Sequence, residues 1–206
     1  MRAPPPRVLA ADERGPGRLE ARDPEAIDGL DPAFRVVMRR ETDRAMTAPG
    51  RAAVRVRRAD RQDIDDAAEV YLRSRYTAVP AIPPLVHDDD DVRDWFAGTV
   101  FNHQELWIAE GASGLVVGVM VLDGDFVKHL YVDPLHVGAG VGSRLLAVAQ
   151  SLRPSGLQLW TFQSNEGARS FYERRGFIAV EWTDGAHNEE RAPDVRYVWR
   201  PSWGRP

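Results

Sequence analysis

The segment FVKHLYVDPLHVGAGVGSRLL, residues 126–146, decides the fold of this chain. Its apolar run Phe126–Val132 is short and bounded by turn residues, which predicts a buried strand. Gly138, Gly140 and Gly142 then alternate with small residues, and apolar residues recur at helical spacing after them. Glycine allows positive φ and a close approach of a ligand to the main chain. A helix that starts from such a turn presents unpaired N–H groups and its positive dipole end, so an anion site is expected, with phosphate as its ligand.

The glycine pattern alone suggests three interpretations, and the neighbouring residues argue against two of them. A tight strand–helix connection needs no ligand at all. A dinucleotide site needs a third glycine where Ser143 stands and an acidic residue at the end of a strand about 20 residues later, and both are missing. A phosphate loop of the nucleotide-hydrolase type needs Gly-Lys-Ser/Thr, which does not follow.

Two sequence blocks resemble the GNAT family of N-acetyltransferases. Residues 130–134 (LYVDP) and 140–146 (GVGSRLL) are similar to that family's acyl-coenzyme A loop. Residues 165–177 (NEGARSFYERRGF) are similar to its next signature, N-x-x-A-x-x-F-Y-E-x-x-G-F. The blocks stand in the family's order and at its usual distance, and the resemblance covers residues 54–199.

Composition excludes several classes of protein. The chain has 206 residues, a net charge of −4 and a pI near 5.8, so nucleic acid is not expected as the main partner. It has no cysteine, which excludes disulfides, cysteine-ligated metals and a thiol nucleophile. No stretch is long and apolar enough to cross a membrane, and the N-terminus lacks the apolar run of a signal peptide. We therefore expect a cytoplasmic protein with no membrane or metal partner.

The chain is expected to hold a GNAT domain at residues 51–206 and an N-terminal extension at residues 1–50. Residues 1–20 are rich in Pro, Gly, Arg and Ala, which predicts disorder. Residues 24–46 could form a helix, and residues 48–50 a linker. This arm is either a surface appendage or a cover for a neighbour, so a homodimer stays open.

The predicted fold is of the α/β class, with a mixed, mostly antiparallel sheet flanked by helices. The expected strands cover residues 54–58, 105–110, 115–122, 126–132, 156–163, 177–182 and 195–200. Helices are expected from residue 59 onward, behind residues 88–91, after the glycine turn and over residues 166–174, the last ended by Gly176. This is the acyl-CoA N-acyltransferase fold that the resemblance implies.

Two loops bear on the acceptor. The apolar, proline-rich residues 76–85 follow the first helix, and in the resembling family this loop overlies the acceptor site. They form either a pocket wall or a loop packed on the core. The acidic run Asp88–Asp91 suggests a metal or polyamine site, or more simply a helix N-terminus, where carboxylates cap N–H groups. His87 either lines the acceptor pocket or lies on the surface.

The resemblance implies a coenzyme site for acetyl-CoA as co-substrate. A main-chain N–H near Leu130–Val132 would bind the thioester oxygen where the strand splays, the glycine turn would bind the pyrophosphate, Arg144 would assist it, and Asn165 would bond the coenzyme arm. The coenzyme-binding residues are therefore Leu130, Tyr131, Val132, Gly138, Ala139, Gly140, Val141, Gly142, Ser143, Arg144 and Asn165.

The catalytic residues are expected to be Tyr172 and His129. Tyr172 stands where the family often has its general acid, and a phenol with a pKa of about 10 stays protonated at pH 7. It could instead be a core tyrosine. His129 has a reference pKa of about 6.5, which suits proton removal, although a strand histidine can also be structural. Glu189 and Glu190 are rivals for binding an ammonium group, and Glu105 or a water-relayed base stays open.

One position departs from the family pattern. The family usually has Gln or Arg where Val137 stands, and valine cannot donate to the pyrophosphate. The expected function is transfer of an acetyl group from acetyl-CoA to a primary amine of a small molecule or peptide, by direct attack without a covalent enzyme intermediate. The alternatives are a non-catalytic acyl-CoA-binding sensor and an interaction module with the same fold.

Overall fold

The computed structural model describes residues 54–201, which contain one seven-stranded mixed sheet. The strands in chain order are β1 (Arg55–Arg58), β2 (Glu105–Glu110), β3 (Val116–Asp123), β4 (Phe126–Val132), β5 (Leu157–Phe162), β6 (Phe177–Trp182) and β7 (Asp194–Trp199). Their order across the sheet is β1-β2-β3-β4-β5-β7-β6, and β4 with β5 is the one parallel pair. The predicted fold class is confirmed. The predictions for residues 1–50 lie outside the described residues.

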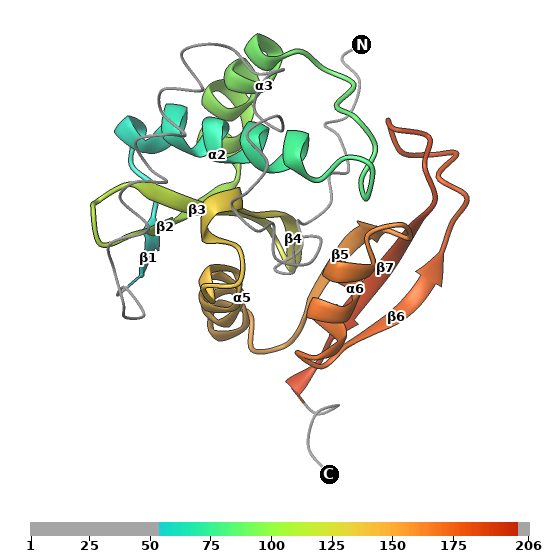
Figure 1. Cartoon of the computed structure of the whole chain (residues 1–206). Helices are drawn as coiled ribbons and strands as arrows, with labels where there is room; N and C mark the ends of the chain where they lie inside the picture. Colours follow the sequence, from blue (N-terminus) through green and yellow to red (C-terminus); the bar gives the residue numbers. More distant parts are fainter. Residues whose placement is uncertain (1–53, 202–206) are drawn as a thin grey trace, which may run out of the picture.

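Helices cover both faces of this sheet. The helices are α2 (Ile64–Thr77), α3 (Asp89–Trp95), α4 (Phe101–His103), α5 (Val141–Leu152) and α6 (Glu166–Glu173), with 3-10 turns at η2 (Arg61–Asp63) and η4 (Pro134–His136) and a π-helical turn at η3 (Phe96–Val100). Figure 1 shows α2 and α3 on one face of β2, β3 and β4, with α5 on the opposite face and α6 beside β5, β7 and β6. Helix α3 begins as the acidic run predicts, because the Asp88 side chain accepts a hydrogen bond of 2.9 Å from the Asp91 N–H.

The two faces of the sheet bury separate apolar cores. Leu130 and Val132 of β4 point into the core under α5 and α6, whereas Tyr131 points into the core under α2 and α3. This division follows from the two-residue period of a strand. Under α5 the packing is tight at Gly118 of β3, where a β-carbon would lie 2.7 Å from a methyl group of Val141. The glycine therefore lets the first turn of α5 lie directly on the sheet.

Strands β4 and β5 diverge along their length. Within residues 54–201 their pairing consists of Phe126 opposite Gln158, next to a hydrogen bond of 2.9 Å from the Gln158 N–H to the Asp125 carbonyl. A bulge lies just beyond this pair, since Val127 and His129 pair with consecutive residues of β3 and Lys128 between them has no opposite residue. Such a bulge bends and twists the strand. The remainder of β4 thus presents an open edge toward β5.

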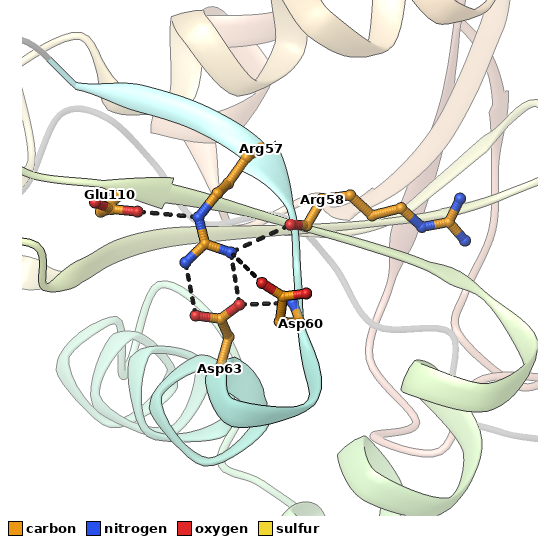
Figure 2. Close-up of polar contacts among 5 residues, drawn as sticks. All are labelled: Arg57, Arg58, Asp60, Asp63 and Glu110. Atoms are coloured by element: carbon orange, nitrogen blue, oxygen red, sulfur yellow. Dashed lines mark hydrogen bonds and ion pairs between the residues drawn. The ribbon is translucent and has the colours of Figure 1, made fainter.

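A charge network fastens β1 to the start of the helical layer. The Arg57 guanidinium donates two hydrogen bonds to Asp63, of 2.7 and 2.8 Å, and one of 3.0 Å to Glu110 on β2. The Asp63 carboxylate also accepts from the Asp60 N–H at 2.6 Å (Figure 2). The hydrogen bonds from Arg57 hold the pKa of Asp63 below its ordinary value. The Asp63 carboxylate therefore holds the start of α2 against β1.

We predict that Asp63→Asn lowers the free energy of unfolding by about 2 kcal/mol at pH 7, because two charge-assisted hydrogen bonds are weakened. A lowered folded-state pKa adds stability above the unfolded value of about 3.9, and that stability is lost as the pH falls through the folded pKa. The gap between wild type and variant should therefore shrink below pH 4 or so. Urea unfolding at a series of pH values checks this. Asp66→Asn, an exposed residue of the same turn, is the control, and a gap independent of pH would contradict the account.

Candidate functional site

The open edge of β4 exposes two main-chain N–H groups. The Asp133 N–H donates to the Val117 carbonyl of the preceding segment at 3.0 Å, and Tyr131 pairs with Val119 on β3. Hydrogen-bonding direction alternates along an antiparallel strand. The N–H groups of Leu130 and Val132 therefore point away from β3, toward the gap that opens beside β5. Two aligned donors on an unpaired edge can bind a carbonyl oxygen and the polar groups of an extended ligand.

The glycine loop after β4 has the conformation that the sequence predicts. Gly138 and Gly140 have φ values of 80° and 83°, and Gly140 is the N-terminal cap of α5. The N–H groups in the first turn of α5 have no partner within the helix. A β-carbon on Gly140 would meet no atom within 4 Å, so the space beside the loop is open. The loop can thus cradle a phosphate group, as acetyl-CoA requires.

An arginine from the turn after α6 reaches the first turn of α5. The Arg175 guanidinium donates to Oγ of Ser143, donates to the Phe171 carbonyl at 2.9 Å and lies 3.7 Å from the centre of the Phe171 ring. Arg144, by contrast, donates to the Val54 carbonyl at 2.9 Å. The side chain of Val137 packs against the core. Arg175, which sequence reasoning missed, therefore places a positive charge beside the first turn of α5.

Helix α6 places two further predicted residues. The Asn165 side chain accepts from the Ala168 N–H at 3.0 Å and so caps the helix. Tyr172 is fully buried, with its ring 5.0 Å from that of Phe171 and 5.5 Å from that of Phe177. Tyr172 thus lies on the α5 side of the sheet. Its role as an acid stays a prediction.

His129 of β4 is buried against aromatic rings on the other face. Its ring centre lies 4.9 Å from that of Trp95 and 5.8 Å from that of Tyr71. Burial lowers the pKa of His129 to about 3, assisted by the charges of Lys128 and Arg75. The imidazole is therefore neutral at pH 7, and an ammonium group would gain little by transferring a proton to it. The geometry favours a positioning role over that of a base.

A buried ion pair lies beside the same face of β4. Arg75 of α2, with no exposed side-chain surface, donates to Glu190 at 3.0 Å and to the Pro83 carbonyl at 3.3 Å. Glu190 belongs to the loop between β6 and β7, and its side chain is 4% exposed. Burial raises the pKa of Glu190, although the charge of Arg75 opposes this rise. The pair joins the β6–β7 loop, the proline-rich loop and α2.

Several polar atoms around this pair have no hydrogen-bond partner among the described residues. They are Oε2 of Glu190, Nε1 of Trp95 and Nδ1 of His129. The Arg75 guanidinium, by contrast, also interacts with the side chain of Tyr131. We call Arg75, Glu190, Trp95 and His129 the buried polar cluster. Unsatisfied buried groups at this density are costly in a protein interior, so the cluster is suited to a polar ligand.

The other predicted acceptor residues lie farther out. His87 and Glu189 contact each other at 3.0 Å on the surface. Glu105 is occupied by an ion pair with Arg153. Within residues 54–201 no three acidic or histidine side chains are grouped as a metal ion requires, and no helix is long and apolar enough to cross a bilayer.

The structure thus brings the glycine loop and the open edge of β4 together, with the acceptor-side residues on the opposite face. Sequence reasoning considered Glu190 but not its partner Arg75. A signal was available, because Arg75 follows the buried Ala68 and Tyr71 at helical spacing and so lies on the apolar side of α2. An arginine there needs a buried partner.

Comparison with known proteins gives a consistent result. Residues 102–179 match the model of the acetyltransferase (GNAT) domain. Peptidyl-lysine N-acetyltransferase YiaC of Escherichia coli is 29% identical over 152 residues, which is 72% of this chain and 95% of YiaC. Peptidyl-lysine N-acetyltransferase YjaB of the same organism is 38% identical over 72 residues, 35% of this chain and 48% of YjaB.

The fold also matches solved structures. The solution structure of apo YjaB from Escherichia coli superposes with a TM-score of 0.59 at 22% identity and covers 71% of this chain and 97% of that structure. At this identity the likeness concerns the fold alone.

We predict that Glu190→Ala lowers the free energy of unfolding by about 3 kcal/mol, because it leaves the Arg75 guanidinium buried without its counter-charge. Glu189→Ala, in the same loop and partly exposed, should cost less than about 1 kcal/mol. Urea unfolding of the three proteins measures the difference. Equal stability of the two variants would show that the buried pair contributes nothing.

Proposed function

Because the chain belongs to the GNAT acetyltransferase family, we propose that it transfers an acetyl group from acetyl-CoA to a primary amine of a peptide or small molecule, by direct attack. The observation that carries this proposal is the open edge of β4 next to the glycine loop. These features lie consecutively along residues 126–146, as a coenzyme with a long arm and a pyrophosphate requires.

In this proposal the coenzyme is held mainly by main-chain donors. The N–H groups of residues 138–143 would hold the pyrophosphate, with Arg175 supplying a positive charge beside Ser143. The N–H groups of Leu130 and Val132 would receive the thioester oxygen and the arm. Acetyl-CoA supplies an activated acyl group whose carbonyl oxygen gains negative charge during attack, and fixed N–H donors stabilise that charge.

Tyr172 is the proposed proton donor to the leaving sulfur. It is fully buried on the side of the sheet that carries α5, α6 and the glycine loop. His129 is retained as a neutral residue that shapes the acceptor side of β4 and holds no charge there.

A lysine side chain in a peptide is the acceptor that we favour. The similar proteins YiaC and YjaB are named peptidyl-lysine N-acetyltransferases. In this chain the acidic Asp88–Asp91 turn lies near Glu189 of the β6–β7 loop, since His87 contacts both Asp91 and Glu189. Their charge favours a cationic substrate. The cytoplasmic location and the absence of a nucleic-acid partner stay predictions.

Gly140→Glu tests the coenzyme site. A side chain there is strained at a φ of 83°, fills the open space and brings a negative charge to the phosphate position. We predict that calorimetry detects acetyl-CoA binding to the wild type and none to the variant. Thiol release with a lysine peptide should be lost as well. Gly114→Glu is the matched control, because Gly114 has a φ of 80° and equally open surroundings in the remote β2–β3 turn.

The outcomes separate the alternatives. Binding together with thiol release supports the enzyme. Tight binding without release for every amine tested would favour the acyl-CoA sensor. Loss of binding in both glycine variants would attribute the effect to backbone strain and not to the site.

Arg175→Leu tests whether Arg175 contacts the pyrophosphate, a contact that Val137 cannot make. We predict that the Kd for acetyl-CoA rises about tenfold, because a charge-assisted contact to phosphate is lost. The exposed neighbour Arg174→Leu should leave the Kd unchanged. S-acetylpantetheine, which lacks the pyrophosphate, should bind wild type and Arg175→Leu equally. A similar loss with both ligands would rule out a phosphate contact.

A further inference from the structure

A carboxylate oxygen in the buried polar cluster has a geometry that suits proton transfer. Oε1 of Glu190 accepts from Arg75 at 3.0 Å, whereas Oε2 is buried and has no hydrogen-bond partner among the described residues. The fixed Arg75 contact leaves only this second oxygen available. A buried carboxylate with one oxygen anchored and one unsatisfied is prepared for a cationic hydrogen-bond donor.

The cluster also lies beside the strand that presents the acyl group. Arg75 lies next to Tyr131 of β4 and Tyr71 of α2. Burial alone would lower the pKa of Arg75, but these two tyrosines and Glu190 raise it. Tyr131 is the residue between Leu130 and Val132, whose N–H groups line the open edge. The chain Glu190–Arg75–Tyr131 therefore connects the β6–β7 loop to the point where the thioester would lie.

We propose that Glu190 is the catalytic residue that binds the acceptor's ammonium group through Oε2 and removes its proton, and that Arg75 positions it. This inference rests on the proposed acetyl transfer and names the base for it. It also assigns the acceptor to a cationic amine, because an ammonium group donates a stronger, charge-assisted hydrogen bond to the Glu190 oxygen than a neutral donor does.

The protons balance with the residues available. One N–H proton of the ammonium group passes to Glu190, and the lone pair on nitrogen attacks the thioester carbonyl carbon. The C–N bond forms and the C–S bond breaks while the Tyr172 hydroxyl gives its proton to the departing sulfur. The nitrogen returns its second proton to the Tyr172 oxygen, and Glu190 releases its proton to solvent. The products are an amide, a thiol and one proton.

The surroundings of Glu190 tune this exchange. Burial and the neighbouring carboxylate of Glu189 raise its pKa, and Arg75 lowers it, with the raised direction prevailing. Glu190 lies close enough to Tyr71 of α2 that its charge contributes to raising the pKa of the Tyr71 phenol. His129 of β4 remains neutral and does not compete for the proton. A carboxylate with a raised pKa is a better base toward an ammonium group than an exposed one.

The test uses the full chain and two probe peptides, N-acetyl-Gly-Lys-Gly-amide and an analogue whose lysine amine is replaced by an aminooxy group, which is already neutral at pH 7. Glu190→Gln keeps an oxygen that can accept from Arg75 but removes the basic carboxylate. We expect kcat/KM for the lysine peptide to fall about 100-fold at pH 7, and for the aminooxy peptide by less than about fivefold. Asp184→Asn, which changes an exposed carboxylate of the same β6–β7 loop, is the control and should behave as the wild type.

A structural role for Glu190 would give a different result. Equal losses with both peptides, or no loss with the lysine peptide, would overturn the proposal. The acidic limb of the wild-type pH profile for kcat/KM should also disappear in Glu190→Gln with the lysine peptide.

If the wild type acetylates neither peptide, the proposed lysine acceptor fails and the Glu190 site is tested by binding alone. Calorimetry with the lysine peptide and with its norleucine counterpart, which lacks the ammonium group, then decides. A preference for the lysine peptide in the wild type that Glu190→Gln loses supports the site. The same affinity for both peptides in the wild type contradicts it.

Discussion

The divergence of β4 from β5 is the constraint on which the rest of the site depends. The two parallel strands share one residue pair and then separate, so the main chain of β4 keeps N–H groups that no neighbouring strand within residues 54–201 uses. Unpaired donors are tolerated only where water or a ligand can reach them. The bulge at Lys128 bends β4 next to this opening, and α5 packs directly on the neighbouring strand β3 at Gly118.

The alternation of side chains along β4 separates two tasks. Leu130 and Val132 anchor the strand in the core beneath α5 and α6, the side that carries the glycine loop and Tyr172. Tyr131 and His129 face α2, where Arg75 meets Glu190. The coenzyme and the acceptor can thus approach the same peptide groups from opposite faces of one strand. In the proposed reaction the acyl group is held at the strand itself, with Arg75 and Glu190 on one side of it and Arg175 on the other.

Local patterns predicted the elements well, because apolar period, turn glycines and caps act over a few residues. The strand at Phe126–Val132 and the Asp88 cap of α3 are confirmed by the structure. Contacts between distant residues were not predictable in this way. Arg75 and Glu190 are separated by 115 positions, and Arg175 reaches Ser143 across 32. Nothing local in either arginine's sequence identifies its partner. The extent of pairing between β4 and β5 is likewise a property of the assembled sheet.

Amide hydrogen exchange followed by NMR, with and without acetyl-CoA, tests the central claim most directly. The account predicts that the amides of Leu130 and Val132 exchange quickly in the free protein and become protected when acetyl-CoA is added. The Tyr131 amide, bonded to β3, should be protected in both states. Unchanged exchange at Leu130 and Val132 in the presence of bound acetyl-CoA would show that the open edge of β4 is not where the acyl group is held.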